Sequence, residues 1–230
     1  MLPFIEKQDA YRGIDLSRHY EDQPSGKWRF VPRVFLCPSD RATSTEKNYY
    51  ACNYVGISGG GNTGDENGII VPPDKGAITP AAVIDGLSNT LVITESGSFF
   101  RYSDGSESPN RKHATFRTEA QYRLPSEIEN FAAECFSDSE LSVAPFSIGS
   151  EWMEESIGVT RIICIFPKQP RNCNNGGSYV GALFAPNSTH AGGVYCGFGD
   201  GSVRMVSEDI SEIVWQGVGS RDNGEIISGL

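Results

Sequence analysis

Basic residues and long apolar runs are both scarce in this sequence. Lys and Arg number 19 against 29 Asp and Glu, so the net charge is −10. A field of that sign repels phosphate backbones, which excludes nucleic-acid binding by a broad basic surface. The longest stretch without a charged side chain, 172–199, is rich in Gly, Asn and Ser and cannot lie in hydrocarbon. Residues 1–13 also lack a basic start followed by an apolar core, so we expect neither a membrane span nor a signal peptide.

None of the six cysteines forms a Cys-x-x-Cys pair, which removes the main support for a zinc ribbon or a thioredoxin-like site. An even count in a chain with 26 Gly and 13 Pro fits disulfides, and six reduced, buried thiols in a cytosolic protein are the alternative. Two pairs would close short loops, Cys37 with Cys52 and Cys164 with Cys173. These are the disulfide candidates, although 15 complete pairings are open.

Signatures of catalysis are also few. The sequence contains no His-Glu-x-x-His and no P-loop, and its three histidines are His19, His113 and His190. We therefore do not expect an enzyme. The remaining catalytic hypothesis is a hydrolase centred on His190, with Ser188 and Asp200 as its partners.

The hydrophobic patterns predict one α+β domain over 1–230, with an antiparallel sheet and a few packed helices. Glu127 to Phe136 carries an apolar stripe at helical spacing. Gly199-Asp200-Gly201 lies between two apolar runs, which predicts a C-terminal β-hairpin followed by a short helix from Asp209. The remaining predictions are a short helix at 2–11, a β-prone run at 30–36, and strands at 48–57, 90–94, 158–166 and 225–227.

Asp85, Asn89, Glu95, His190 and Asp200 are the candidate binding residues, and two interpretations of them remain open. Asp, Asn and Ser beside Gly commonly fix turns through local side-chain-to-backbone hydrogen bonds, with no ligand. In that case His190 would only satisfy a loop carbonyl. Alternatively, His190 joins Asp85 or Glu95 in a shared metal or polar site.

The acidic composition makes calcium a natural electrostatic companion. The glycine-rich loop 58–68 holds the best candidates by oxygen count, Asn62, Asp65, Glu66 and Asn67. It lacks the EF-hand spacing, so a solvated glycine loop is the alternative. No other cofactor is expected.

Three segments together carry a family resemblance: Phe35-Leu36-Cys37-Pro38-Ser39-Asp40, Ile84 to Thr90 (IDGLSNT), and Asn187 to Val203. In the last, nine residues separate His190 from Asp200-Gly201, which matches the H-X9-DG signature of the DUF1559 family. The chain resembles this pilin-like family, abundant in planctomycete bacteria, along nearly its whole length, weakly between Phe99 and Ser178. Members typically begin with a type IV prepilin leader and a long hydrophobic helix. Because this chain starts about where the family's globular part is under way, that helix is expected to be absent.

The resemblance implies a non-catalytic, extracytoplasmic globular head of a pilin or pseudopilin-like protein, with a structural or surface-assembly role. Its implied partners are other pilin-like subunits or proteins of a type II secretion-like machinery. Membrane attachment would run only through the missing helix. A soluble, calcium-dependent ligand- or carbohydrate-binding module is the alternative function, and the hydrolase is the second alternative.

Overall fold

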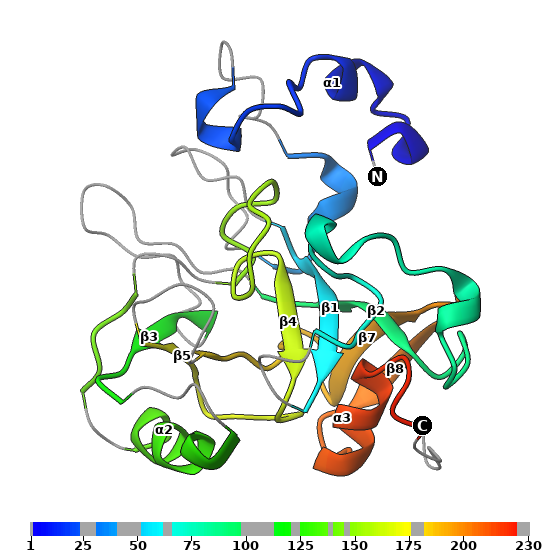
Figure 1. Cartoon of the computed structure of the whole chain (residues 1–230). Helices are drawn as coiled ribbons and strands as arrows, with labels where there is room; N and C mark the ends of the chain where they lie inside the picture. The colour runs from blue at the N-terminus through cyan, green and yellow to red at the C-terminus, as the bar shows by residue number, and fades with distance from the viewer. Residues whose placement is uncertain are drawn as a thin grey trace.

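The computed structural model describes residues 2–23, 31–40, 52–61, 66–97, 113–120, 125–137, 140–144, 148–175 and 182–224 (Figure 1). The predicted strand 225–227 and the calcium candidates Asn62 and Asp65 lie outside these residues. Within them the chain forms two sheets and a few helices, so the α+β class is confirmed.

The larger sheet has five strands in the order β4-β1-β2-β7-β8. Three of its four pairings are antiparallel, but β4 runs parallel to β1. The prediction of an antiparallel sheet therefore holds for β1, β2, β7 and β8 but not for the β4 edge. The chain leaves β1 and returns to β4 after about a hundred residues, and a connection of that length lets a strand enter in either direction. The strands are β1 (Tyr54–Gly60), β2 (Leu91–Glu95), β4 (Arg161–Cys164), β7 (Gly193–Phe198) and β8 (Val203–Ser207).

The hairpin of β7 and β8 confirms the C-terminal prediction. Its register runs from Gly193 opposite Ser207 to Gly197 opposite Val203. Gly201 takes φ +84 in the turn, a backbone conformation that L side chains rarely adopt. The sequence Asp-Gly therefore marks the turn for a physical reason, and the two strands follow directly on either side.

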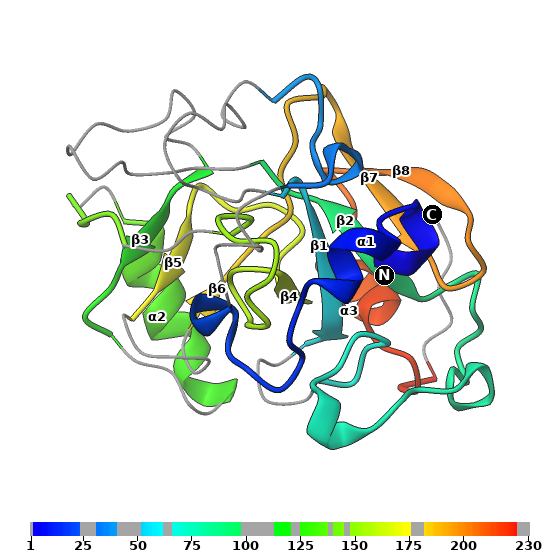
Figure 2. The ribbon, with the colours of Figure 1, turned by 90° about the horizontal axis from the view of Figure 1, so that it is seen from above.

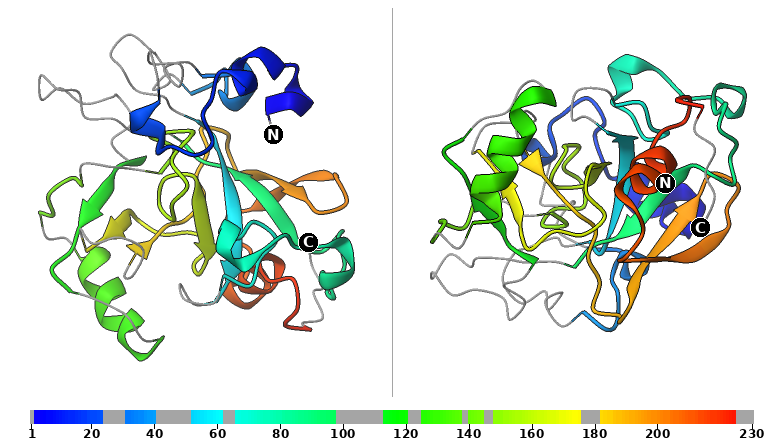
Figure 3. Two further views of the ribbon diagram at one scale, coloured as in Figure 1. Left: turned by 45° about the horizontal axis from the view of Figure 1, so that its top comes forward. Right: turned by 90° about the horizontal axis from the view of Figure 1, so that it is seen from below.

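Helix α3 (Glu212–Gly219) covers one face of this sheet, where it contacts β1, β4 and β2 (Figure 3). Its buried side chains, Trp215 and Val218, join the main hydrophobic core. The approach is so close that a Cβ on Gly60 would lie 1.8 Å from the carbonyl oxygen of Gln216. The predicted start at Asp209 is wrong, because the N-cap residue is Ser211.

The smaller sheet has the order β3-β5-β6 and lies beside the larger one (Figure 2). Its strands are β3 (Thr115–Arg117), β5 (Asn172–Asn174) and β6 (Ala182–Leu183). Helix α2 (Ile128–Cys135) follows a 3₁₀ turn at Pro125–Glu127 and confirms the helix predicted at 127–136. Its buried Phe131 shares a core with Cys173 and Leu183.

The disulfide of the structure joins Cys135 to Cys173 and ties α2 to β5. The predicted partners are therefore wrong: Cys173 does not pair with Cys164, and Cys37 does not pair with Cys52. The prediction used loop length, whereas the pairing depends on which elements pack together across the fold. Four cysteines remain as thiols and all are buried, namely Cys37, Cys52, Cys164 and Cys196.

The N-terminal region is built from short helical pieces. A 3₁₀ turn (Leu2–Ile5) and α1 (Gln8–Arg12) replace the single helix predicted at 2–11. Within the β-prone run at 30–36, Pro32 precedes a 3₁₀ turn at Arg33–Phe35. Further 3₁₀ turns span Tyr20–Asp22, Pro73–Lys75 and Pro80–Ala82. Among the described residues, no helix has the length and apolar character needed to cross a bilayer.

Candidate functional site

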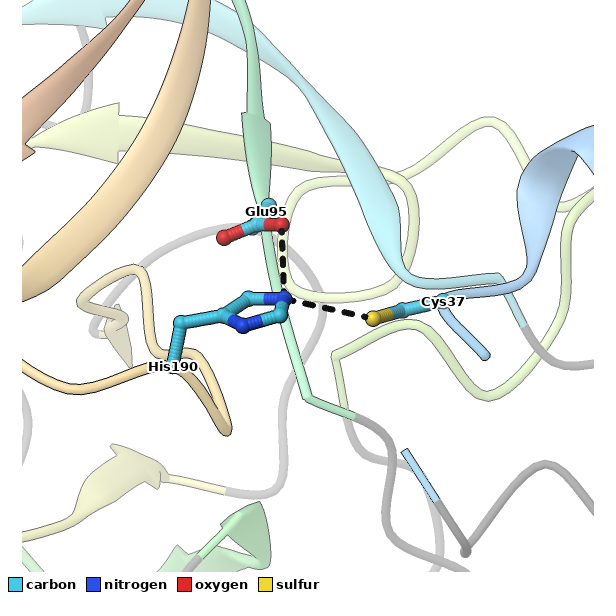
Figure 4. Close-up of side chains that lie close together, drawn as sticks. All are labelled: Cys37, Glu95 and His190. Carbon is cyan, nitrogen blue, oxygen red and sulfur yellow. Dashed lines mark hydrogen bonds and ion pairs between the residues drawn. The ribbon is translucent and has the colours of Figure 1, made fainter. Parts of the chain in front are cut away.

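Three ligand-type side chains from distant parts of the chain meet at one end of β7 (Figure 4). The Sγ of Cys37 lies 3.7 Å from Nε2 of His190. The same nitrogen lies 3.8 Å from Oε1 of Glu95. The structure thus brings together His190 and Glu95, which the sequence offered as partners, and adds Cys37.

Cys37 is held by its backbone at the start of a turn. Its carbonyl oxygen accepts a hydrogen bond from the Asp40 N–H at 3.0 Å. Its own N–H donates to Oδ1 of Asn53 at 2.8 Å, and Asn53 in turn donates to Oδ2 of Asp40 at 2.7 Å. The Phe35–Asp40 motif therefore fixes the thiol beside β1 without using the sulfur itself.

Glu95 ends β2, and within the described residues one of its carboxylate oxygens accepts a backbone hydrogen bond. The N–H of Tyr195, on β7, donates to Oε2 at 3.0 Å. This leaves Oε1 directed at the imidazole of His190. The Glu95 side chain is 8% exposed, and its ion pair within the described residues is the one with His190.

His190 lies in the loop that leads into β7. Its backbone N–H donates to Oγ of Ser188 at 3.0 Å, and its ring meets that of Tyr195 edge-on with centroids 6.0 Å apart. The side chain is 38% exposed, so the site opens to solvent on the imidazole side.

The pKa of Tyr54 is sensitive to negative charge near this site. Burial raises the pKa of Tyr54 above its usual value, and negative charge at Cys37 and Glu95 adds to the effect in the same direction.

The other candidate residues lie at the opposite end of β7 and make turns. Oδ1 of Asp200 accepts the Ser202 N–H at 2.9 Å. Interactions with Ser202, first with its side chain and then with this backbone N–H, lower the pKa of Asp200. The two carboxylate oxygens of Asp85 accept the backbone N–H groups of Asn223 and Gly224, at 3.1 and 2.8 Å. Asn89 donates to the Asp85 carbonyl at 2.9 Å.

The strand β7 separates His190 from Asp200. Six residues of strand extend about 20 Å, so the two side chains lie too far apart for a direct hydrogen bond. Ser188 uses its Oγ to accept a backbone N–H. The structure thus does not assemble Ser188, His190 and Asp200 as a catalytic triad.

A Gly-x-Ser-x-Gly pattern is present at Gly56–Gly60, but its serine lies inside β1. Ser58 is fully buried and accepts a hydrogen bond from Nη1 of Arg161 at 2.9 Å. A nucleophile elbow requires an exposed serine on a sharp strand-to-helix turn, so this pattern has no such role here.

The described calcium candidates have other partners. The Glu66 carboxylate lies 3.0 Å from Arg161 and 3.1 Å from Lys75. Oδ1 of Asn67 accepts the Gly60 N–H at 2.9 Å. Arg161 and Lys75 therefore already neutralise the carboxylate of Glu66, which is the charged one of these two candidates.

A cavity of about 220 Å³ opens beside His190, between the hairpin, α3 and residues 167–169. Trp215 and Gln169 line it. The indole Nε1 of Trp215 and Oε1 of Gln169 are buried and have no hydrogen-bond partner within the described part of the chain. Both atoms are shielded from water, so a small molecule in the cavity would reach either one only after a local side-chain rearrangement.

Sequence reasoning missed Cys37 as a site residue, although it lies within one of the three segments that carry the family resemblance. Its position in that segment was the signal that could have identified Cys37, because the spacing of the residues gave no indication of it. Comparison with curated proteins and with solved structures gives no match. The family described as "protein of unknown function (DUF1559)" matches residues 1–212. The chain therefore belongs to the DUF1559 family.

Proposed function

We propose that this chain is a non-catalytic, extracytoplasmic globular domain that assembles with other pilin-like subunits through its β7–β8 hairpin. The observation that carries the proposal is an exposed apolar face on this hairpin. Tyr195, Val203 and Met205 are 45%, 66% and 53% exposed. We call these three residues the hairpin face.

The register explains why these side chains share one side of the sheet. Tyr195 lies opposite Met205 and Gly197 lies opposite Val203, so the side chains at these positions project in the same direction. The alternate residues, Val194, Cys196 and Phe198, are buried in the core beneath α3. One face of the β7–β8 pair therefore packs in the core, and the other presents apolar side chains to solvent.

The position of β8 adds to the argument. Among the described strands it pairs with β7 alone, so its outer edge is open. Soluble monomers rarely leave an apolar edge strand uncovered, because it can pair with another chain. An exposed apolar face beside an open edge is the arrangement expected of a subunit contact.

Two further observations support an extracytoplasmic location and pilin-like partners. The disulfide between Cys135 and Cys173 fits an oxidising compartment. Membership of the DUF1559 family supports pilin-like partners through the resemblance described above.

Photocrosslinking in the native host tests the proposal. A photoreactive amino acid at Met205 should give an adduct with a second copy or with another pilin-like subunit, identified by mass spectrometry. Val203→Glu should abolish the adduct, because a charge on this face opposes burial. Leu16→Glu is the matched control, since Leu16 is 73% exposed but belongs to the N-terminal region. A chain that gives no adduct, or that fractionates with the cytoplasm, would contradict the proposal.

A ligand-binding module is the second candidate function, and the cavity beside His190 favours it. Polar side chains line this cavity, among them Gln169, Asn187 and His190, and could hydrogen-bond to a small polar ligand. Thermal shift against a panel of monosaccharides and amino acids tests this function, with Gln169→Leu as the variant. A raised melting temperature in the wild type that Gln169→Leu loses would support it.

A further inference from the structure

We propose that Cys37, Glu95 and His190 form a Zn²⁺ site, with Sγ, Oε1 and Nε2 as protein ligands and one position open to solvent. This inference goes beyond the assembly role, because it concerns other side chains and does not depend on the hairpin face.

The distances between the ligand atoms suit a tetrahedral ion. Zinc bonds of about 2.0–2.3 Å at tetrahedral angles place neighbouring ligand atoms about 3.3–3.8 Å apart. The Sγ–Nε2 and Nε2–Oε1 separations are 3.7 and 3.8 Å. All three atoms lie within 4.8 Å of one another. Closure around an ion therefore needs only a small movement, and His190 can supply it from an exposed loop.

The kind of ligand atom selects the metal class. A thiolate, an imidazole and a carboxylate are the ligands that zinc uses, whereas calcium and magnesium take oxygen ligands. Three protein ligands and an open fourth position are a frequent zinc arrangement, with water or an outside group as the fourth ligand.

The direction of approach favours a metal over a cysteine nucleophile. In a catalytic triad the nucleophile and the orienting acid contact different nitrogens of the histidine. Here Cys37 and Glu95 both approach Nε2. Convergence of three donor atoms on one point is what a metal ion requires.

The surrounding hydrogen bonds orient two of the ligands. The N–H of Cys37 is fixed by Asn53, and Oε2 of Glu95 by the N–H of Tyr195. Such outer contacts position metal ligands and leave the coordinating atoms available. Glu95 is also a buried carboxylate, and a divalent cation would compensate its charge.

The other three thiols do not offer a comparable site. Burial raises the pKa of Cys52 to about 12 and that of Cys196 to about 11, and it raises that of Cys164 well above its usual value. In the part of the chain that the structure describes, Cys37 is the thiol that lies in a three-ligand cluster.

Direct titration of the purified full chain with Zn²⁺, after removal of metal with a chelator, tests the proposal. We expect one Zn²⁺ per chain. Cys37→Ser, Glu95→Gln and His190→Ala should each weaken binding by at least about tenfold, because each removes a ligand. His19→Ala is the matched control: His19 lies 3.8 Å from Glu154, the same kind of pair, but is not part of a three-ligand cluster. It should leave the affinity unchanged.

Alkylation of the wild-type protein decides the question even where a variant fails to fold. At a Zn²⁺ concentration a hundred times Kd, the metal-free fraction is about 1%, so modification of Cys37 should slow about a hundredfold. Ca²⁺ and Mg²⁺ should not protect it. Peptide mapping reports each cysteine separately. Unchanged alkylation of Cys37 with Zn²⁺, or equal Zn²⁺ affinity in the wild type and the three ligand variants, would overturn the proposal.

Discussion

The two ends of β7 differ in what their polar side chains do. At the end that follows Phe198, Asp200 and Asp85 use their carboxylate oxygens on backbone N–H groups of nearby turns. At the end that begins at Gly193, the side chains of Cys37, Glu95 and His190 point at one another. The first set fixes the chain, while the second gathers three ligand atoms, two of them on buried residues and one on the half-exposed imidazole of His190.

This difference divides the H-X9-DG signature into two parts with separate roles. The nine residues between His190 and Asp200 include all of β7. The Asp-Gly part makes the turn, and the histidine part joins the ligand cluster. Residues of one sequence signature therefore take part in two separate sites of the fold.

The largest expected effect is at the middle of β7. Burial, more than any other cause, raises the pKa of Cys196 from 9.0 to about 11. The native state therefore keeps the thiol neutral while the unfolded state ionises. The stabilisation that comes from keeping this thiol neutral is complete below pH 9 and is lost as the pH rises to about 11. The unfolding free energy lost is at most about 3 kcal/mol, at 1.36 kcal/mol per pH unit.

Urea unfolding of the wild type and Cys196→Ser between pH 8 and 11 measures this loss. The serine variant should show a flatter alkaline decline. If the unfolding free energy declines equally with pH in the two proteins, the thiol is accessible to water. In that case no water-free core separates the two ends of β7.

Glu95→Ala is expected to cost about 1–3 kcal/mol of unfolding free energy, because the N–H of Tyr195 loses its acceptor. Glu95→Gln keeps an acceptor and should cost less, although it removes the carboxylate ligand. Denaturant unfolding in the presence of a chelator compares the two. Equal costs would mean that the carboxylate charge, and not the hydrogen bond, stabilises this end.

Gly192→Ala and Gly201→Ala form a matched pair across β7. Both glycines have positive φ, +90 and +84, and a Cβ at either position would have no heavy atom within 4 Å. Each substitution should therefore cost about 1 kcal/mol through backbone strain alone. Only Gly192→Ala, two residues from His190, should also weaken Zn²⁺ binding, so a loss in Gly201→Ala as well would break the comparison.

The smallest effect is expected for Asp200→Asn. Interactions with Ser202, first with its side chain and then with its backbone N–H, lower the pKa of Asp200 from its usual value of 3.8. Its stabilising contribution is therefore present above that pH and is lost as the pH falls further. Melting temperatures between pH 7 and 2 should fall slightly more in the wild type than in the variant. A change in Zn²⁺ affinity for Asp200→Asn would contradict the structural role of this end.

Local signals predicted much of the fold. The Gly199-Asp200-Gly201 turn gave the hairpin, and the apolar stripe at 127–136 gave α2, because both patterns act between close neighbours. The direction of β4 and the partner of Cys173 depend on packing between distant segments. A single sequence carries no local signal for either.

The candidate site shows the same limit. The pairing of His190 with Glu95 could be proposed because both residues belong to or follow familiar motifs. Cys37 lies 153 residues from His190, and only the folded chain shows that they meet. The turn role of Asp200 was open in the sequence and follows from its hydrogen bond to Ser202.

A crystal structure of the full chain grown with Zn²⁺, with anomalous diffraction at the zinc edge, tests the central claim most directly. The account predicts one strong peak within about 2.0–2.3 Å of Sγ of Cys37, Oε1 of Glu95 and Nε2 of His190. Zinc bound only at other residues, or an empty cluster at saturating Zn²⁺, would contradict it.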